Sequence, residues 1–166
     1  MRVINKKIGE TPIEALKNFR IKYRGLKNEK MSYAGRLDPL AEGKMIVLVG
    51  DKENKDRNRY MDLGKEYSAE FMIGVSTLKI KNIDLKIIKK NILNKIDIVS
   101  GDFRQDEITE KWKYFFKHSE QKIFQTYSFK IKVSGGTFIR GLAEEFEKSL
   151  RVPVALYSLK RTRIFT

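Results

Sequence analysis

Two segments of the chain alternate apolar and polar residues with a period of two, which is the pattern of a strand that buries one face. In residues 67–75, the apolar positions are Tyr67 and every second residue after it. In residues 127–133, the alternation begins at Tyr127 and is more regular still, with one serine and two lysines between the apolar positions. Each segment therefore predicts a half-buried antiparallel strand.

Three other segments predict helices. One is expected to begin at Thr11, which can cap it, because Pro12 suits the first turn and Glu14 lies three residues after the cap. Apolar residues recur at helical spacing in residues 85–96, with lysines on the other side, and again in residues 139–150. These patterns are typical of helices that pack one face against a sheet.

The rest of the chain completes the predicted architecture. An apolar run at residues 45–49 predicts a short buried strand, and residues 26–43 before it are expected to form a loop. Residues 51–63 predict a surface helix that ends at Gly64, and a last strand is expected over residues 154–165. Because strands and helices are interleaved, we expect an α+β fold: a mixed, mainly antiparallel sheet with helices packed on one side.

Composition narrows the class of protein. With 166 residues, of which 41% are hydrophobic and 34% charged, the chain is expected to form one domain with one core. Its longest apolar run is too short for a membrane span, and its first residues lack the apolar segment of a secretion signal, so a cytoplasmic protein is expected. The absence of cysteine excludes disulfides, and with a single histidine, His118, it disfavours a zinc site.

The charge balance points to a polyanionic partner. Lysine and arginine number 35 against 21 acidic residues, which gives a formal net charge of +14. Solubility alone would need far fewer charges. Nucleic acid is the favoured partner, and an anionic membrane surface is a weaker alternative.

One carboxylate lies in an unusual loop, residues 33–43. Pro39 favours an extended backbone at Asp38, and Gly35 and Gly43 permit tight turns on either side. Asp38 is therefore either held in place for chemistry or makes an ordinary side-chain turn before proline. The spacing alone favours the second interpretation.

A second candidate lies where the strand of residues 127–133 gives way to the following helix. Arg140 is predicted near the first turn of that helix, where a positive charge is unfavourable and needs a partner. Asp38 could be that partner, because a guanidinium can bind a carboxylate through two N–H···O bonds. The alternatives are a solvated arginine or a phosphate contact, and the residues alone leave this open.

Four blocks, taken in order, resemble the TruB-type tRNA pseudouridine synthases. They are YAGRLDPLAEG at residues 33–43, KEYSA at residues 65–69, SGGTFIR at residues 134–140 and LKRT at residues 159–162. Residues 6–11 also resemble an N-terminal motif of that family, with Lys7 where proline is usual. The resemblance covers about residues 3–77 and 124–164, which is most of the chain.

The resemblance implies an RNA-modifying isomerase. Members of the family flip a uridine out of a folded RNA, detach its base from C1′, turn it and rejoin it through C5, without a cofactor or metal. Asp38 matches the essential aspartate, which either attacks C1′ or removes the 2′ proton, and Arg140 matches the arginine that pairs with it. Tyr67 matches the tyrosine that stacks on the target base and takes part in removing the C5 proton. The implied target is the T-arm uridine of tRNA.

The resemblance also implies four residues close to the substrate. Leu159 matches an apolar residue that walls the base pocket. Tyr33 stands where many members have a histidine near the flipped base. Lys6 is expected to support the site loop, and Arg36 to contact a phosphate.

The chain departs from the family in its middle and at its end. The aspartate-rich turn expected after residue 77 is replaced by Leu78-Lys-Ile-Lys81, and the segment that grips RNA is shortened. No PUA-like domain follows Thr166, so we expect residues 1–166 to form a single catalytic domain without a C-terminal RNA-binding domain, acting as a monomer. Basic side chains are then expected to contact the RNA backbone: Lys79, Lys81, Lys86, Lys89, Lys90, Lys160, Arg161 and Arg163. The alternatives are a catalytically silent basic RNA-binding or RNA-folding protein with the same fold, and a ribosome-associated protein with no site.

Overall fold

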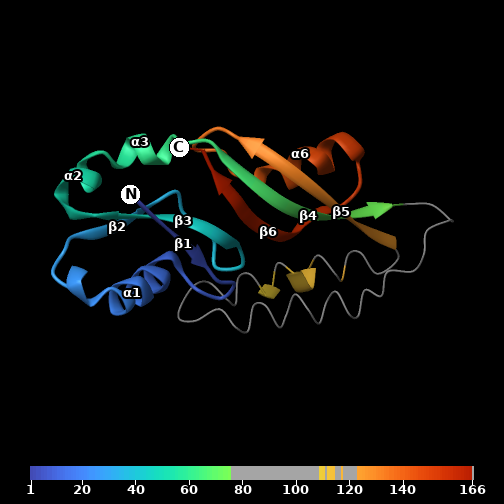
Figure 1. Ribbon diagram of the computed structural model, residues 1–166. Coiled ribbons are helices and arrows are strands. Elements are labelled where there is room, and N and C mark those ends of the chain that lie inside the picture. The colour runs from blue at the N-terminus through green and yellow to red at the C-terminus, as the bar shows by residue number, and fades with distance from the viewer. Residues whose placement is uncertain (76–108, 111, 115–116, 118–122, 166) are drawn as a thin grey trace.

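The computed structural model describes residues 1–75, 109–110, 112–114, 117 and 123–165 (Figure 1). The strands are β1 (Arg2–Lys6), β2 (Met31–Ala34), β3 (Glu42–Val49), β4 (Lys65–Val75), β5 (Ile123–Val133) and β6 (Val154–Ile164). The helices are α1 (Pro12–Lys22), α2 (Gly50–Lys55), α3 (Arg57–Met61) and α6 (Gly141–Leu150), with a 3₁₀ turn η1 (Arg24–Leu26). None of the helices described is long and apolar enough to cross a membrane.

The strands form one mixed, mainly antiparallel sheet, as predicted. Its order is β1-β3-β6-β4-β5, and β2 pairs with β3 beside this path. The β3–β6 pair is parallel and short, joining Glu42 and Gly43 to Lys160 and Arg161, whereas the other described pairs are antiparallel. Figure 1 shows β1–β3 with α1–α3 on one side of this junction and β4–β6 with α6 on the other. The short parallel pair therefore joins two halves of the molecule.

Helices cover both faces of the sheet, not one as expected. The main core lies between one face and α1 and α6; its buried members are Ala15, Leu37, Ala41, Met45, Tyr67, Ala69, Phe71, Ile73, Ile139, Ala143 and Val154. A second, smaller cluster consists of Ala34, Ile46 and Leu48, against which Tyr60 of α3 packs. Met45 and Ile46 are consecutive in β3 and so point to opposite faces. Residues 45–49 form an unbroken apolar run because β3 is covered on both sides.

The two alternating segments form strands of unequal burial. β4 and β5 pair along their whole lengths, from Lys65↔Val133 to Val75↔Ile123. β4 lies between β5 and β6 and is more buried than expected, since Met72, on the face opposite Phe71, is fully covered. On β5, Tyr127 and Phe129 remain exposed. The difference follows from position in the sheet, which the alternation alone does not reveal.

The first helix has the predicted start. The Glu14 backbone N–H donates to the Thr11 hydroxyl oxygen at 3.2 Å, and the Thr11 backbone N–H donates to the Glu14 carboxylate at 2.7 Å. Pro12 occupies the first turn, and the helix buries Ala15 and Phe19 against the sheet. This reciprocal capping fixes the point at which the chain leaves β1 and enters α1.

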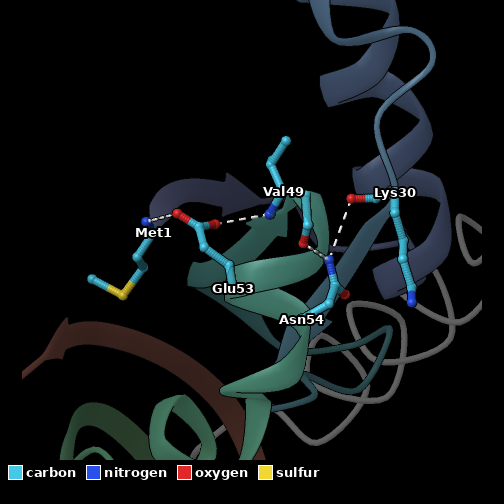
Figure 2. A network of polar contacts seen from close by, with 6 residues as sticks. Met1, Lys30, Val49, Glu53 and Asn54 are labelled. Carbon is cyan, nitrogen blue, oxygen red and sulfur yellow. Dashed lines mark hydrogen bonds and ion pairs between the residues drawn. The ribbon is translucent and has the colours of Figure 1, made fainter.

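Two expectations about the first half need correction. Residues 26–43 contain the strand β2, which pairs with residues 46–49 of β3, and the single helix expected over residues 51–63 is two short helices. Side chains of α2 hold this region together (Figure 2). Glu53 accepts a hydrogen bond from the Val49 N–H at 2.8 Å and pairs with the amino group of Met1. Asn54 donates hydrogen bonds to the carbonyl oxygens of Lys30 and Gly50. The helix predicted over residues 85–96 lies outside the described residues.

Candidate active site

Asp38 lies in the connection between β2 and β3, where two glycines shape the chain. Gly35 and Gly43 have φ of 72° and 109°, values that favour glycine, as their sequence positions suggested. Gly43 also approaches β6 so closely that an added Cβ would lie 2.3 Å from the carbonyl oxygen of Arg161. Leu37 is buried in the main core beside Asp38. The loop is therefore held at its two ends by the glycine turns and, beside Asp38, by the buried side chain of Leu37.

Lys6, at the end of β1, contacts the backbone of this loop. The residue is 1% exposed, and its ammonium donates to the carbonyl oxygens of Lys7, Pro39 and Ala41 at 2.8, 3.2 and 2.6 Å. Burial lowers the pKa of Lys6 from 10.5 to about 8, and Glu10 opposes the shift. Lys6 is thus a buried cation that ties the end of β1 to the two residues around Leu40.

The predicted contact between Asp38 and Arg140 is present. Arg140 Nε lies 3.1 Å from Asp38 Oδ2. Arg140 occupies the position just before the first residue of α6, and its neighbour Ile139 is buried in the main core. The Arg140 side chain is 68% exposed and that of Asp38 is 32% exposed, so the pair is open to solvent. The unfavourable arginine at a helix start thus has a carboxylate partner from a distant loop.

Tyr67 and Leu159 lie on the same face of the sheet, in or against the main core. Tyr67, on β4, is 4% exposed, and Leu159, on β6, is half-buried and packs against this core. The hydroxyl oxygen of Tyr67 accepts a hydrogen bond from Arg161 Nε at 3.0 Å. The guanidinium carbon of Arg161 lies 5.2 Å from the centre of the Tyr67 ring. A strand register that pairs Tyr67 with Arg161 produces this contact.

The other two predicted substrate contacts flank the Asp38 loop. Tyr33 is half-buried on β2 and packs against the main core, while its carbonyl oxygen accepts from Arg57 at 3.2 Å. Arg36 is exposed. The neighbours of Asp38 and Arg140 belong to the same core as Tyr67, so the predicted residues border one apolar cluster.

One expected RNA contact is wrong. The sequence predicts that Arg161 faces RNA, but the residue is 2% exposed and its guanidinium donates four hydrogen bonds inside the protein. Lys160 and Arg163 are exposed as expected, although Lys160 lies 3.3 Å from Glu42. A signal was present in the sequence, because Arg161 follows Leu159 by two positions on a strand and so shares its face. The lysines predicted at residues 79–90 lie outside the described residues.

The described residues contain no group of three His, Cys, Asp or Glu side chains placed to hold a metal ion. The chemistry available from the residues described is that of a carboxylate with a guanidinium partner, next to an aromatic and aliphatic cluster. Such a set can bind and orient a nucleobase and bring one carboxylate oxygen to its sugar.

Comparison with known families and proteins identifies the family. The family model described as TruB family pseudouridylate synthase (N terminal domain) matches residues 23–122, more than half of the chain. The chain belongs to this family. The tRNA pseudouridine synthase B of Borreliella afzelii is 30% identical over 198 residues, covering 98% of this chain and 68% of the relative. That of Protochlamydia amoebophila is 26% identical, covering 97% and 72%.

Solved structures agree on the fold. A crystal structure of the archaeal box H/ACA sRNP Nop10-Cbf5 complex matches with a TM-score of 0.59 and 20% identity, over 98% of this chain. A structure of an H/ACA RNP bound to a substrate RNA containing 2′-deoxyuridine matches with a TM-score of 0.59 and 21% identity. This TruB-family chain spans about half the length of those chains, 47% in each case. The α+β fold and the family resemblance predicted from the sequence are confirmed.

Proposed function

We propose that this chain is an RNA pseudouridine synthase that isomerises a flipped-out uridine, with the T-arm uridine of tRNA as its target. The observation that carries the proposal is the Asp38–Arg140 ion pair at 3.1 Å. It joins two of the sequence blocks that resemble the family, and it is exposed enough for a nucleoside to reach. Family membership and relatives named tRNA pseudouridine synthase B support the substrate class.

The reaction exchanges one glycosidic bond for another. The bond between N1 and C1′ breaks, a bond between C5 and C1′ forms, the C5 proton leaves, and N1 ends protonated. Asp38 either attacks C1′ directly or removes the 2′ proton, and both routes need an ionised carboxylate. The Arg140 guanidinium, 3.1 Å from Asp38 Oδ2, holds the carboxylate in orientation. The net change involves no oxidation or reduction.

Tyr67 is proposed as the stacking partner of the uracil ring, and its hydroxyl as a participant in removing the C5 proton. Its ring belongs to the core that also buries Leu37 and Ile139, the neighbours of the ion pair. Because Tyr67 is only 4% exposed, stacking requires adjacent side chains to move aside as the base enters. Leu159, on the neighbouring strand β6, and Tyr33, on the more distant strand β2, then border the base.

The decisive experiment is tritium release from a T-arm hairpin labelled at C5 of its uridines. Wild type should release tritium, Asp38→Asn should release none, and a hairpin with cytidine at the target position should not react. Asp51→Asn is the matched control, since Asp51 is a 75% exposed carboxylate that pairs with a lysine elsewhere on the surface. Release that is absent in wild type, or equal in wild type and Asp38→Asn, contradicts the proposal. Hairpin binding without release would instead support the silent RNA-binding protein.

We also propose that the chain acts as a monomer in the cytoplasm, and that charge supplies much of its RNA affinity. The net charge of +14 supports the last point. Hairpin affinity should fall steeply between low and physiological salt, because each phosphate contact releases counterions. A dissociation constant that does not change with salt would contradict it, and sedimentation with and without RNA tests the monomer.

A further inference from the structure

The guanidinium of Arg161 connects three parts of the candidate site. Its Nε donates to the hydroxyl of Tyr67 at 3.0 Å, and its two terminal nitrogens donate to Gly35 O at 2.8 Å, Lys44 O at 3.2 Å and Arg36 O at 3.1 Å. The three carbonyls come from both sides of Asp38: two lie just before it and one lies after it, in β3. The fourth acceptor is the residue proposed to stack on the base.

Burying the Arg161 guanidinium costs desolvation free energy, which the packing of its side chain alone does not explain. The side chain is 2% exposed, and burial lowers the pKa of the Arg161 guanidinium, a shift that Tyr67 opposes. Its acceptors are neutral oxygens, which compensate a buried charge less well than a carboxylate does. An apolar side chain of similar volume would fill the same space without that cost. The guanidinium is better explained by the groups that it holds in place.

Only a guanidinium can make these contacts together. Its donors are arranged in a rigid planar fork, so Arg161 reaches Tyr67 in one direction and the loop carbonyls in two others. A lysine has one nitrogen and cannot occupy all of these positions. Because Arg161 donates to the Tyr67 hydroxyl oxygen, the Tyr67 hydroxyl must direct its own proton away from Arg161.

We propose that Arg161 is a positioning residue for catalysis: it locks the Tyr67 ring and both ends of the Asp38 loop into one unit. The ring that stacks on the base and the carboxylate that acts on the sugar then keep a fixed relative placement. The inference rests on the proposed function, and it assigns to a buried arginine a role in the rate of reaction and not in RNA binding.

The test uses Arg161→Lys, which keeps the charge and loses the fork. In single-turnover tritium release with saturating hairpin, the rate should fall by about 30-fold, because small misplacements of reacting groups have large effects on rate. The hairpin dissociation constant should change by less than about threefold, since Arg161 does not face RNA. All rates are normalised to the folded fraction, measured by urea unfolding.

The matched control is Thr162→Val. Thr162 is the next residue on β6, and its hydroxyl donates to the carbonyl and carboxylate of Glu66, away from the Asp38 loop. This variant should weaken the same strand and leave the normalised rate within about twofold of wild type. If Arg161→Lys behaves like Thr162→Val, the role is structural only and the inference is overturned.

A measurement on wild type keeps the inference testable should Arg161→Lys fail to fold. With ¹⁵N-labelled arginine, the Arg161 Nε–H should exchange slowly with solvent, both free and with hairpin bound, whereas exposed arginines exchange fast. Fast exchange at Arg161, or exchange that accelerates when RNA binds, overturns it. An inactive wild type would instead overturn the proposed function, so the two failures are distinguishable.

Discussion

Two arginines meet the Asp38 loop in opposite ways. Arg140 is 68% exposed and contacts the Asp38 carboxylate, whereas Arg161 is 2% exposed and contacts the loop backbone and Tyr67. An exposed ion pair adds little to stability and can rearrange around a substrate. A buried, multiply bonded guanidinium leaves unpaired groups behind when it is removed. The comparison predicts that one arginine can be changed with little effect on folding and the other cannot.

The sharpest way to isolate the exposed arginine is Arg140→Gln. Loss of the cation beside Asp38 should lower the single-turnover rate by about 1,000-fold, because the carboxylate loses its ionic partner and its orientation. The free energy of unfolding should change by less than about 1 kcal/mol, as is usual for exposed pairs. Arg59→Gln, an exposed arginine of α3, is the control and should leave both quantities unchanged. A rate within tenfold of wild type would contradict the role given to Arg140.

The packing around the buried Arg161 can be disrupted most directly at Gly43, which lies against the Arg161 backbone. Gly43→Ala would place a Cβ 2.3 Å from the Arg161 carbonyl oxygen at a φ of 109°. The free energy of unfolding should fall by about 3 kcal/mol or more, from the clash and the strained backbone together. Gly25→Ala is the control, since nothing lies within 4 Å of its added Cβ. Equal urea midpoints for the two variants would contradict the close approach.

The elements that sequence reasoning predicted are those fixed by local pattern. The capping box of Thr11 and Glu14 located the start of α1, and the alternation from Tyr67 located β4. The Asp38–Arg140 contact was predicted from the family resemblance, and the unfavourable arginine at a helix start was consistent with it. In these cases, neighbours in sequence or a motif already contain the required information.

What the sequence did not reveal depends on distant contacts. β2 is four residues long, too short to show a period, and it forms because β3 offers a partner. Arg161 stands in a run of basic residues, Lys160 to Arg163, that is typical of a solvated strand end. Its burial depends on carbonyls contributed by a loop far earlier in the chain. The pattern of charges did not contain that information, although the position relative to Leu159 did.

Lys6 extends the comparison, because it is a buried cation that can lose its proton. Its pKa is about 8 in the folded chain against an ordinary value of 10.5. Between these values the unfolded chain keeps a proton that the folded chain has released, so Lys6 makes the free energy of unfolding rise with pH, by at most about 1.4 kcal/mol per unit. Below pH 8 both states are protonated and the contribution is constant.

The measurement is urea unfolding of wild type and Lys6→Met from pH 6 to 10. Other titrating groups cancel in the difference between the two proteins, so wild type should gain stability relative to Lys6→Met only above about pH 8. A difference that stays constant across this range, or that falls above pH 8, would show that Lys6 keeps its proton in the folded state. Arg161 should add no pH dependence to the free energy of unfolding in this range, since its guanidinium stays charged throughout.

The smallest expected effect is on hairpin affinity, at the exposed side chain of Phe138. This ring is 79% exposed and stands two residues before Arg140 in the chain. An exposed aromatic ring is a stacking surface for an unpaired RNA base, so Phe138→Ala should weaken hairpin binding by about fivefold and leave the rate at saturating RNA unchanged. Ile21→Ala, which removes a 71% exposed apolar side chain from α1, should change neither. A loss of rate without loss of affinity would instead place Phe138 with Arg161, among the residues that position the reacting groups.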